Sequence, residues 1–82
     1  MEVSSAIYTA LELKYRAEIQ ASKATLMIYF NNTVAIGEHP QHLKEMDDLL
    51  ETMSVAQAKI INLNKYFSNY CKDNVSFRRA SP

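Results

Sequence analysis

The sequence predicts an all-α protein, an antiparallel hairpin of two long helices that pack together like a coiled coil. The chain of 82 residues holds one glycine and two prolines, and Gly37 and Pro40 stand together near its middle, so it has one internal break. On each side of that break, apolar residues recur in alternating steps of three and four, the heptad spacing of a coiled-coil seam. The two rows are also complementary in side-chain size.

The first helix is expected over about residues 3–31. Ser4 and Ser5 are suitable caps near its start, and Asn31 and Asn32 suit its end because asparagine tolerates the left-handed conformation there. Its heptad row is mostly small and has one polar member: Val3, Ala6, Ala10, Leu13, Ala17, Gln20, Ala24 and Met27. We expect this row to face the second helix.

A loop over residues 32–39 joins the helices. Val34 and Ile36 make it more apolar than a simple solvated turn, so we expect them to fold over the end of the helices. Gly37 supplies a backbone conformation that other residues disfavour.

The second helix is expected from Pro40, a favoured first-turn residue, to about Cys71, and an aperiodic tail over residues 72–82 follows. Its heptad row has no polar interruption and is mostly large: Met46, Leu49, Met53, Ala56, Ile60, Leu63, Phe67 and Tyr70. The whole chain, residues 1–82, is predicted to be a single helical-hairpin domain.

The two rows match each other in an antiparallel arrangement, where facing residues have numbers of nearly constant sum. The predicted pairs all add to 73, from Met27 with Met46 beside the loop to Val3 with Tyr70 at the other end. Small side chains then face large ones, so the helix axes can approach closely.

Both helices carry more apolar residues than one seam uses. A two-helix hairpin covers one stripe on each helix, and such a surplus indicates an interface. We therefore expect a homodimer that forms a four-helix bundle, with a different protein as the alternative partner. The candidate interface residues are Ile7, Leu11, Tyr15, Ile19, Leu26, Tyr29, Leu50, Ile61 and Tyr66.

No residue pattern predicts an enzyme or a cofactor site. Cys71 is the only cysteine, and both histidines lie about 45 Å away along the second helix at 1.5 Å per residue, too far to serve as its base. His42 and Glu45 share a helix face, but metal sites in helical bundles repeat the motif on another helix. Glu12 and Glu18 are expected to lie off the inward row of the first helix, so we expect no metal.

Composition argues against a nucleic-acid or membrane protein. Nine basic and nine acidic residues give a formal charge of zero, whereas base-stacking surfaces come with a basic groove. An RNA-binding hairpin like the plasmid protein ROP remains the alternative. The longest apolar block, residues 26–30, is far shorter than the roughly 20 residues that span a bilayer. Glu2 stands where a signal peptide is basic, so we expect a cytoplasmic protein.

A set of short segments supplies a family resemblance: Arg16-Ala17-Glu18-Ile19, Lys23-Ala24, Tyr29, Asn31-Asn32 and Ile36-Gly37-Glu38-His39-Pro40. Over about residues 14–67 the chain resembles small uncharacterised proteins of tailed bacteriophages, marine myoviruses especially. The resemblance implies a setting, the bacterial cytoplasm, and brings no assigned activity. We expect a non-enzymatic protein–protein interaction module, such as a phage accessory protein that binds or inhibits a host protein. A minor virion or assembly component is a further alternative.

Overall fold

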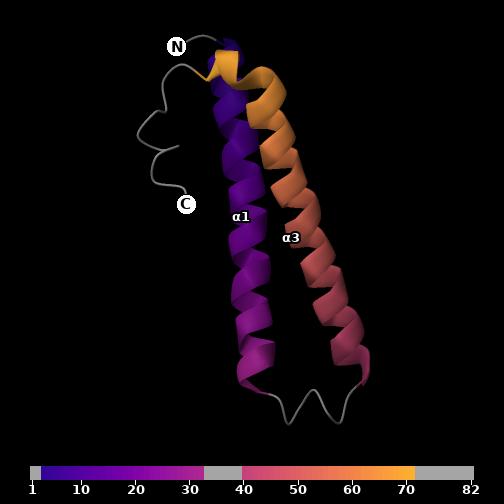
Figure 1. The fold of residues 1–82 in the computed structure, drawn as a ribbon. Helices are drawn as coiled ribbons and strands as arrows, with labels where there is room; N and C mark the ends of the chain where they lie inside the picture. The colour runs from indigo at the N-terminus through magenta and orange to yellow at the C-terminus, as the bar shows by residue number, and fades with distance from the viewer. Residues whose placement is uncertain (1–2, 33–39, 72–82) are drawn as a thin grey trace.

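The structure, a computed structural model, describes residues 3–32 and 40–71. Helix α1 spans Val3–Asn31 and helix α3 spans Pro40–Phe67, and a short 3-10 helix, η1, spans Ser68–Tyr70. The two long helices run antiparallel, side by side, in a rod of 51 × 19 × 17 Å (Figure 1). This arrangement confirms the predicted all-α helical hairpin.

The helix bounds lie close to those expected from the sequence. α1 occupies the expected range, and the backbone N–H of Asn32 bonds to the carbonyl of Tyr29 at its end. α3 ends at Phe67, earlier than expected, because the chain tightens into η1, where the N–H of Cys71 bonds to the carbonyl of Ser68 at 3.0 Å. Such tighter turns are common at helix ends. The expected roles of residues 33–39 and of the tail 72–82 lie outside the described residues.

The register between the helices follows from cross-helix contacts. Three pairs define it: Tyr8 with Asn64, Tyr15 with Lys59, and Tyr29 with Glu45. The residue numbers of each pair add to within one of 73. The predicted position of one helix along the other is therefore confirmed.

The face that α1 turns towards α3 differs from the prediction. The inward row of α1, buried or half-buried throughout, is Ser5, Tyr8, Glu12, Tyr15, Ile19, Ser22, Leu26 and Tyr29. The predicted row is displaced from it by two residues, which is about 200° around a helix of 3.6 residues per turn. Val3, Leu13 and Met27 are consequently exposed, and the predicted pairing of alanines with the large residues of α3 is wrong.

The tyrosines account for this rotation. A tyrosine ring has a large apolar body and a polar end, so it fills the space between two helices while its hydroxyl reaches a polar partner. Tyr8 is buried and donates a hydrogen bond to Asn64. Nearer the loop, where the helices diverge (Figure 1), Tyr29 donates to Glu45 and its ring lies 5.2 Å from that of His42. Alanine side chains would leave this space unfilled.

α3 faces α1 with its predicted row over most of its length. The buried or half-buried members are Met46, Leu49, Met53, Ala56, Ile60 and Leu63. Phe67 and Tyr70, also predicted inward, are exposed. The backbone of Phe67 already departs from helical geometry, with φ −130°, so side chains beyond it no longer return to the same face.

The core between the helices is small and partly polar. Its buried polar members are Ser5, Glu12 and Ser22. Glu12 is 0% exposed, with its carboxylate 3.4 Å from the guanidinium of Arg16 one turn later. The prediction that Glu12 lies off the inward row is therefore wrong. The arginine explains why the carboxylate is tolerated there, since a buried charge requires a partner.

Candidate interaction surfaces

The side of α1 that points directly away from α3 is apolar. We call it the outer face of α1, and its apolar members are Val3, Ala6, Ile7, Ala10, Leu13, Ala17, Ala21, Ala24, Met27 and Ile28. Every one of them is exposed in the hairpin. Three polar residues, which share the heptad positions of these apolar residues, complete the outer face: Lys14, Gln20 and Asn31. A strip in which ten of thirteen residues are apolar is unusual on a surface that meets only water.

The corresponding outer side of α3 has the opposite character. Its residues are Lys44, Asp47, Asp48, Glu51, Ser54, Val55, Ala58, Ile61, Asn62 and Lys65. Most are charged or polar, as on a helix that lies on a core with its other side in solvent. Both helices have the same relation to the core, so solvent exposure alone does not explain the apolar outer face of α1.

The charged groups beside the outer face of α1 are paired within their own helix. The ammonium of Lys14 lies 2.7 Å from the carboxylate of Glu18 one turn later. This hydrogen bond raises the pKa of Lys14 above its ordinary value and lowers the pKa of Glu18. The ammonium of Lys14 also lies 5.7 Å from the ring centroid of Tyr15. The charge nearest to the apolar strip is therefore already neutralised by a neighbour.

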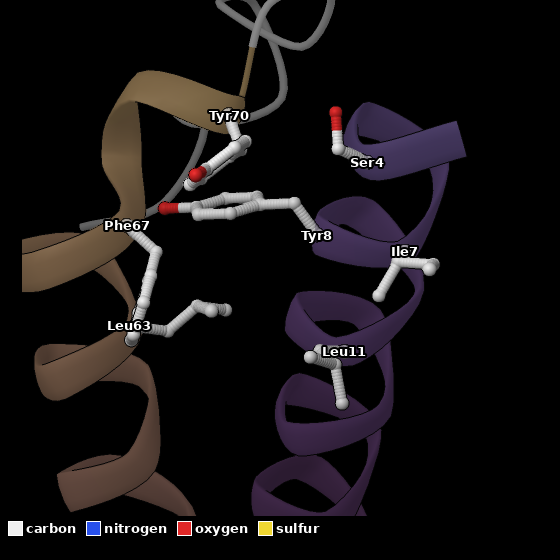
Figure 2. A pocket seen from close by; sticks show the side chains of 7 residues that line it. All are labelled: Ser4, Ile7, Tyr8, Leu11, Leu63, Phe67 and Tyr70. Atoms are coloured by element: carbon white, nitrogen blue, oxygen red, sulfur yellow. The ribbon is translucent and has the colours of Figure 1, made fainter. Parts of the chain in front are cut away.

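A groove of about 430 Å³ opens between α1 and the C-terminal end of α3, beside η1. It is lined by Ser4, Ile7, Tyr8, Leu11, Leu63, Phe67 and Tyr70. Figure 2 shows Tyr8 extending from α1 towards Phe67 and Tyr70. The lining residues include no charged side chain, so the groove suits an apolar group and offers no acid or base. Ile7 lies at the edge of the outer face of α1 and also lines this groove.

The structure divides the predicted interface residues into three groups. Tyr15, Ile19, Leu26 and Tyr29 lie on the inward row of α1, and Leu26 is buried. For these four, the prediction of surplus surface is wrong, because they make the hairpin itself. Leu11 lines the groove. The remaining residues, Ile7, Leu50, Ile61 and Tyr66, are exposed.

The outer face of α1 was visible in the sequence but was assigned to the wrong side. Its members Ala10, Ala17 and Ala24 form the alanine row that we predicted to face α3. The heptad pattern predicted that this row packs against α3, but α3 packs against the other heptad row of α1.

Among the described residues, the imidazole of His42 and the thiol of Cys71 lie far apart. His42 and Cys71 lie at opposite ends of the second helical segment, and Cys71 is a half-buried free thiol. Within residues 3–32 and 40–71, no group of three or more His, Cys, Asp or Glu side chains is placed to hold a metal ion. Neither long helix, over the described residues, is apolar enough along its length to cross a membrane.

The fold and these surfaces define a class of protein, an antiparallel helical hairpin with an exposed apolar face on one helix. No family model, curated protein or solved structure matches the chain.

Proposed function

We propose that this protein is a non-enzymatic interaction module that docks another protein chain on the outer face of α1. The observation that carries the proposal is the contrast between the two helices: the outer face of α1 is an apolar strip along the whole helix, whereas the outer side of α3 is polar. Removing such a strip from water contributes about 25 cal/mol for each Å² buried.

The small core of the hairpin supports the same proposal. The buried apolar residues of the described chain are Tyr8, Leu26, Met46, Ala56 and Ile60. A chain of this size buries a modest fraction of its surface, so small domains often require a further source of stability. Binding of a partner to the folded state alone supplies it by mass action.

The partner is either a second copy of the chain or a different protein. The resemblance to proteins of tailed bacteriophages makes a host protein of the bacterial cytoplasm the natural different partner. An RNA partner has less support. Of the six basic residues in the described chain, Lys14, Arg16 and Lys44 form ion pairs within their own helices, which leaves no continuous basic face.

A pair of leucines offers a matched test. Leu13 on the outer face of α1 is 48% exposed and Leu50 on α3 is 49% exposed, so the same substitution at each removes a similar apolar surface. We expect Leu13→Glu to abolish association and Leu50→Glu to leave it unchanged, because only Leu13 lies in the proposed surface. Sedimentation equilibrium over a range of concentrations measures self-association, and circular dichroism checks that both variants remain helical.

Binding of a different protein is tested with the same variants as baits in a bacterial lysate. The proposal predicts a stoichiometric partner that the wild type and Leu50→Glu retain and Leu13→Glu loses. A wild-type chain that stays monomeric and captures no partner sensitive to Leu13→Glu would contradict the proposed function. Loss of association in Leu50→Glu but not in Leu13→Glu would indicate that the docking surface lies on α3.

A further inference from the structure

The spacing of the outer face of α1 points to its occupant. We propose that the outer face binds the same face of a second copy of this chain, an inference that rests on the proposed function. The two α1 helices run antiparallel, and Ala17 lies at the two-fold axis that relates them. α1 runs from Val3 to Asn31, so Ala17 is its middle residue. Two helices related by an axis at this position overlap along their whole length.

The outer face is complementary to itself in this register. In an antiparallel pair centred on Ala17, facing residues have numbers that add to 34, so Ala10 faces Ala24 and Ala17 faces itself. These three alanines recur every seven residues along the middle of the face, which lets the two helix axes approach closely. A self-complementary patch is what an isologous two-fold interface requires.

The larger side chains of the face also fit this register. Leu13 lies level with Ala21 and Ala6 lies level with Ile28, so a bulky residue is combined with a small one at these levels. Lys14 lies level with Gln20, and Ile7 lies level with Met27. A parallel pair would instead place each residue level with its own copy, so that Leu13 meets Leu13 and Ala21 meets Ala21. Antiparallel packing therefore distributes side-chain volume more evenly along the interface.

Charge complementarity favours the same orientation. Lys14 is the one charged residue of the outer face, and Glu18 lies on the same flank one turn later. In the antiparallel register, the Glu18 of the second copy lies on the flank that Lys14 occupies, about one turn or less away along the axis. A parallel pair would put these groups on opposite flanks. Lys14 pairs with Glu18 of its own helix, and the antiparallel pair places a second carboxylate near it while its stem covers the interface.

The available area is sufficient for a specific dimer. α1 has 29 residues and is therefore about 43 Å long. A strip over about a third of the circumference of such a helix presents roughly 600 Å² of accessible surface on each copy. Two copies would bury roughly 1,200 Å², which reaches the lower end of the range for stable protein–protein interfaces.

The resulting assembly differs from a four-helix bundle. The outer face lies directly opposite α3, so two hairpins that meet there place their α1 helices in the centre and their α3 helices outside. Each α3 keeps its polar outer side in solvent, which agrees with the charged residues found there. The order across the dimer is α3, α1, α1 and α3.

Cysteine cross-linking tests the register. In a background where Cys71→Ser removes the native thiol, Ala10→Cys, Ala17→Cys and Ala24→Cys are made singly. We expect Ala17→Cys to form a disulfide-linked dimer by itself. Ala10→Cys and Ala24→Cys should cross-link only when the two variants are mixed, because like positions are about 21 Å apart along the axis and a disulfide spans Cα atoms less than about 7 Å apart.

Ala58→Cys on the outer side of α3 is the control, because Ala58 is also exposed but lies outside the proposed interface, and we expect no cross-link from it. Self-cross-linking of Ala10→Cys and of Ala24→Cys, each alone, would overturn the antiparallel register in favour of a parallel one. A chain that dimerises in sedimentation but forms none of these disulfides would also overturn the inference, while the proposed interaction function would stand. A monomeric chain that binds a different protein, with binding lost in Leu13→Glu, would likewise overturn the dimer and leave the proposed interaction function standing.

Discussion

The hydroxyl of Tyr8 in α1 donates a hydrogen bond to Oδ1 of Asn64 in α3, 56 residues further along the chain. Tyr8 is 3% exposed, so its ring is part of the core and its hydroxyl reaches through that core to the opposite helix. A contact of this kind sets both the position of α3 along α1 and the side of α1 that faces inward. It therefore helps to leave the alanine row on the outside.

Loss of this hydrogen bond should destabilise the hairpin. We expect Tyr8→Phe to lower the free energy of unfolding by about 1 kcal/mol, the usual net contribution of one hydrogen bond, because the ring remains and only the hydroxyl is removed. Urea denaturation at one fixed protein concentration measures it. Tyr66→Phe is the control, since Tyr66 is exposed, and it should change stability little. Equal effects of the two variants would argue that the Tyr8 hydroxyl does not join the helices.

The buried Glu12 makes Arg16 more important than a surface arginine. Arg16→Met removes the partly exposed cation 3.4 Å from a fully buried carboxylate. We expect a loss of about 1.5–3 kcal/mol, typical of a hydrogen bond to a charged group, because the carboxylate remains buried without that partner. The double variant Glu12→Leu with Arg16→Met should recover most of this loss, since apolar replacement of a buried pair is often neutral. Chemical denaturation of the single and double variants tests the coupling. Additive losses would contradict it.

Two neighbouring alanines of α3 should respond differently to enlargement. Ala56 is buried against α1, so Ala56→Leu should cost about 1–3 kcal/mol through overpacking. Ala58 is on the outer side of α3, and Ala58→Leu should have little effect. Thermal unfolding of both variants makes the comparison. A larger loss of stability in Ala58→Leu than in Ala56→Leu would indicate that the side of α3 with Ala58 packs against α1, contrary to the structure.

The hairpin should lose stability in alkali through Tyr29. Its hydrogen bond to Glu45 raises the pKa of Tyr29 above the ordinary value of 10.0, and burial and the charge of Glu45 act in the same direction. A raised pKa in the folded state means that the neutral hydroxyl stabilises the fold. This contribution is complete below pH 10 and is lost as the pH rises through the raised pKa.

Titration of phenolate absorbance and denaturation on both sides of pH 10 test this prediction. Tyr29→Phe should unfold with a shallower dependence on alkaline pH than the wild type. Glu45→Gln should bring the pKa of Tyr29 back towards its ordinary value, because the carboxylate that accepts the hydrogen bond is gone. Identical alkaline profiles for all three proteins would show that the Tyr29–Glu45 contact does not form in solution.

Several features of the fold could be predicted from the sequence because each depends on local physical chemistry. The single break near Gly37 and Pro40 predicted two helices, and the unbroken heptad spacing predicted that they pack together. The inward row of α3 was predictable over residues 46–63 because the heptad-spaced residues there are all apolar, whereas most residues of the opposite side are charged or polar. The register followed from the hairpin, since a short connection leaves little freedom in how the two helices align.

The inward side of α1 was decided only by tertiary structure. This helix has two rows with heptad spacing, one of alanines and one that contains Tyr8, Tyr15 and Tyr29, and the pattern alone does not rank them. The tyrosine row faces inward because the hydroxyls of Tyr8 and Tyr29 donate hydrogen bonds to Asn64 and Glu45 of α3. The tyrosine rings also fill space between the helices that alanine side chains would leave empty. The candidate docking surface depends on the same choice: whichever row does not face α3 remains available to a partner.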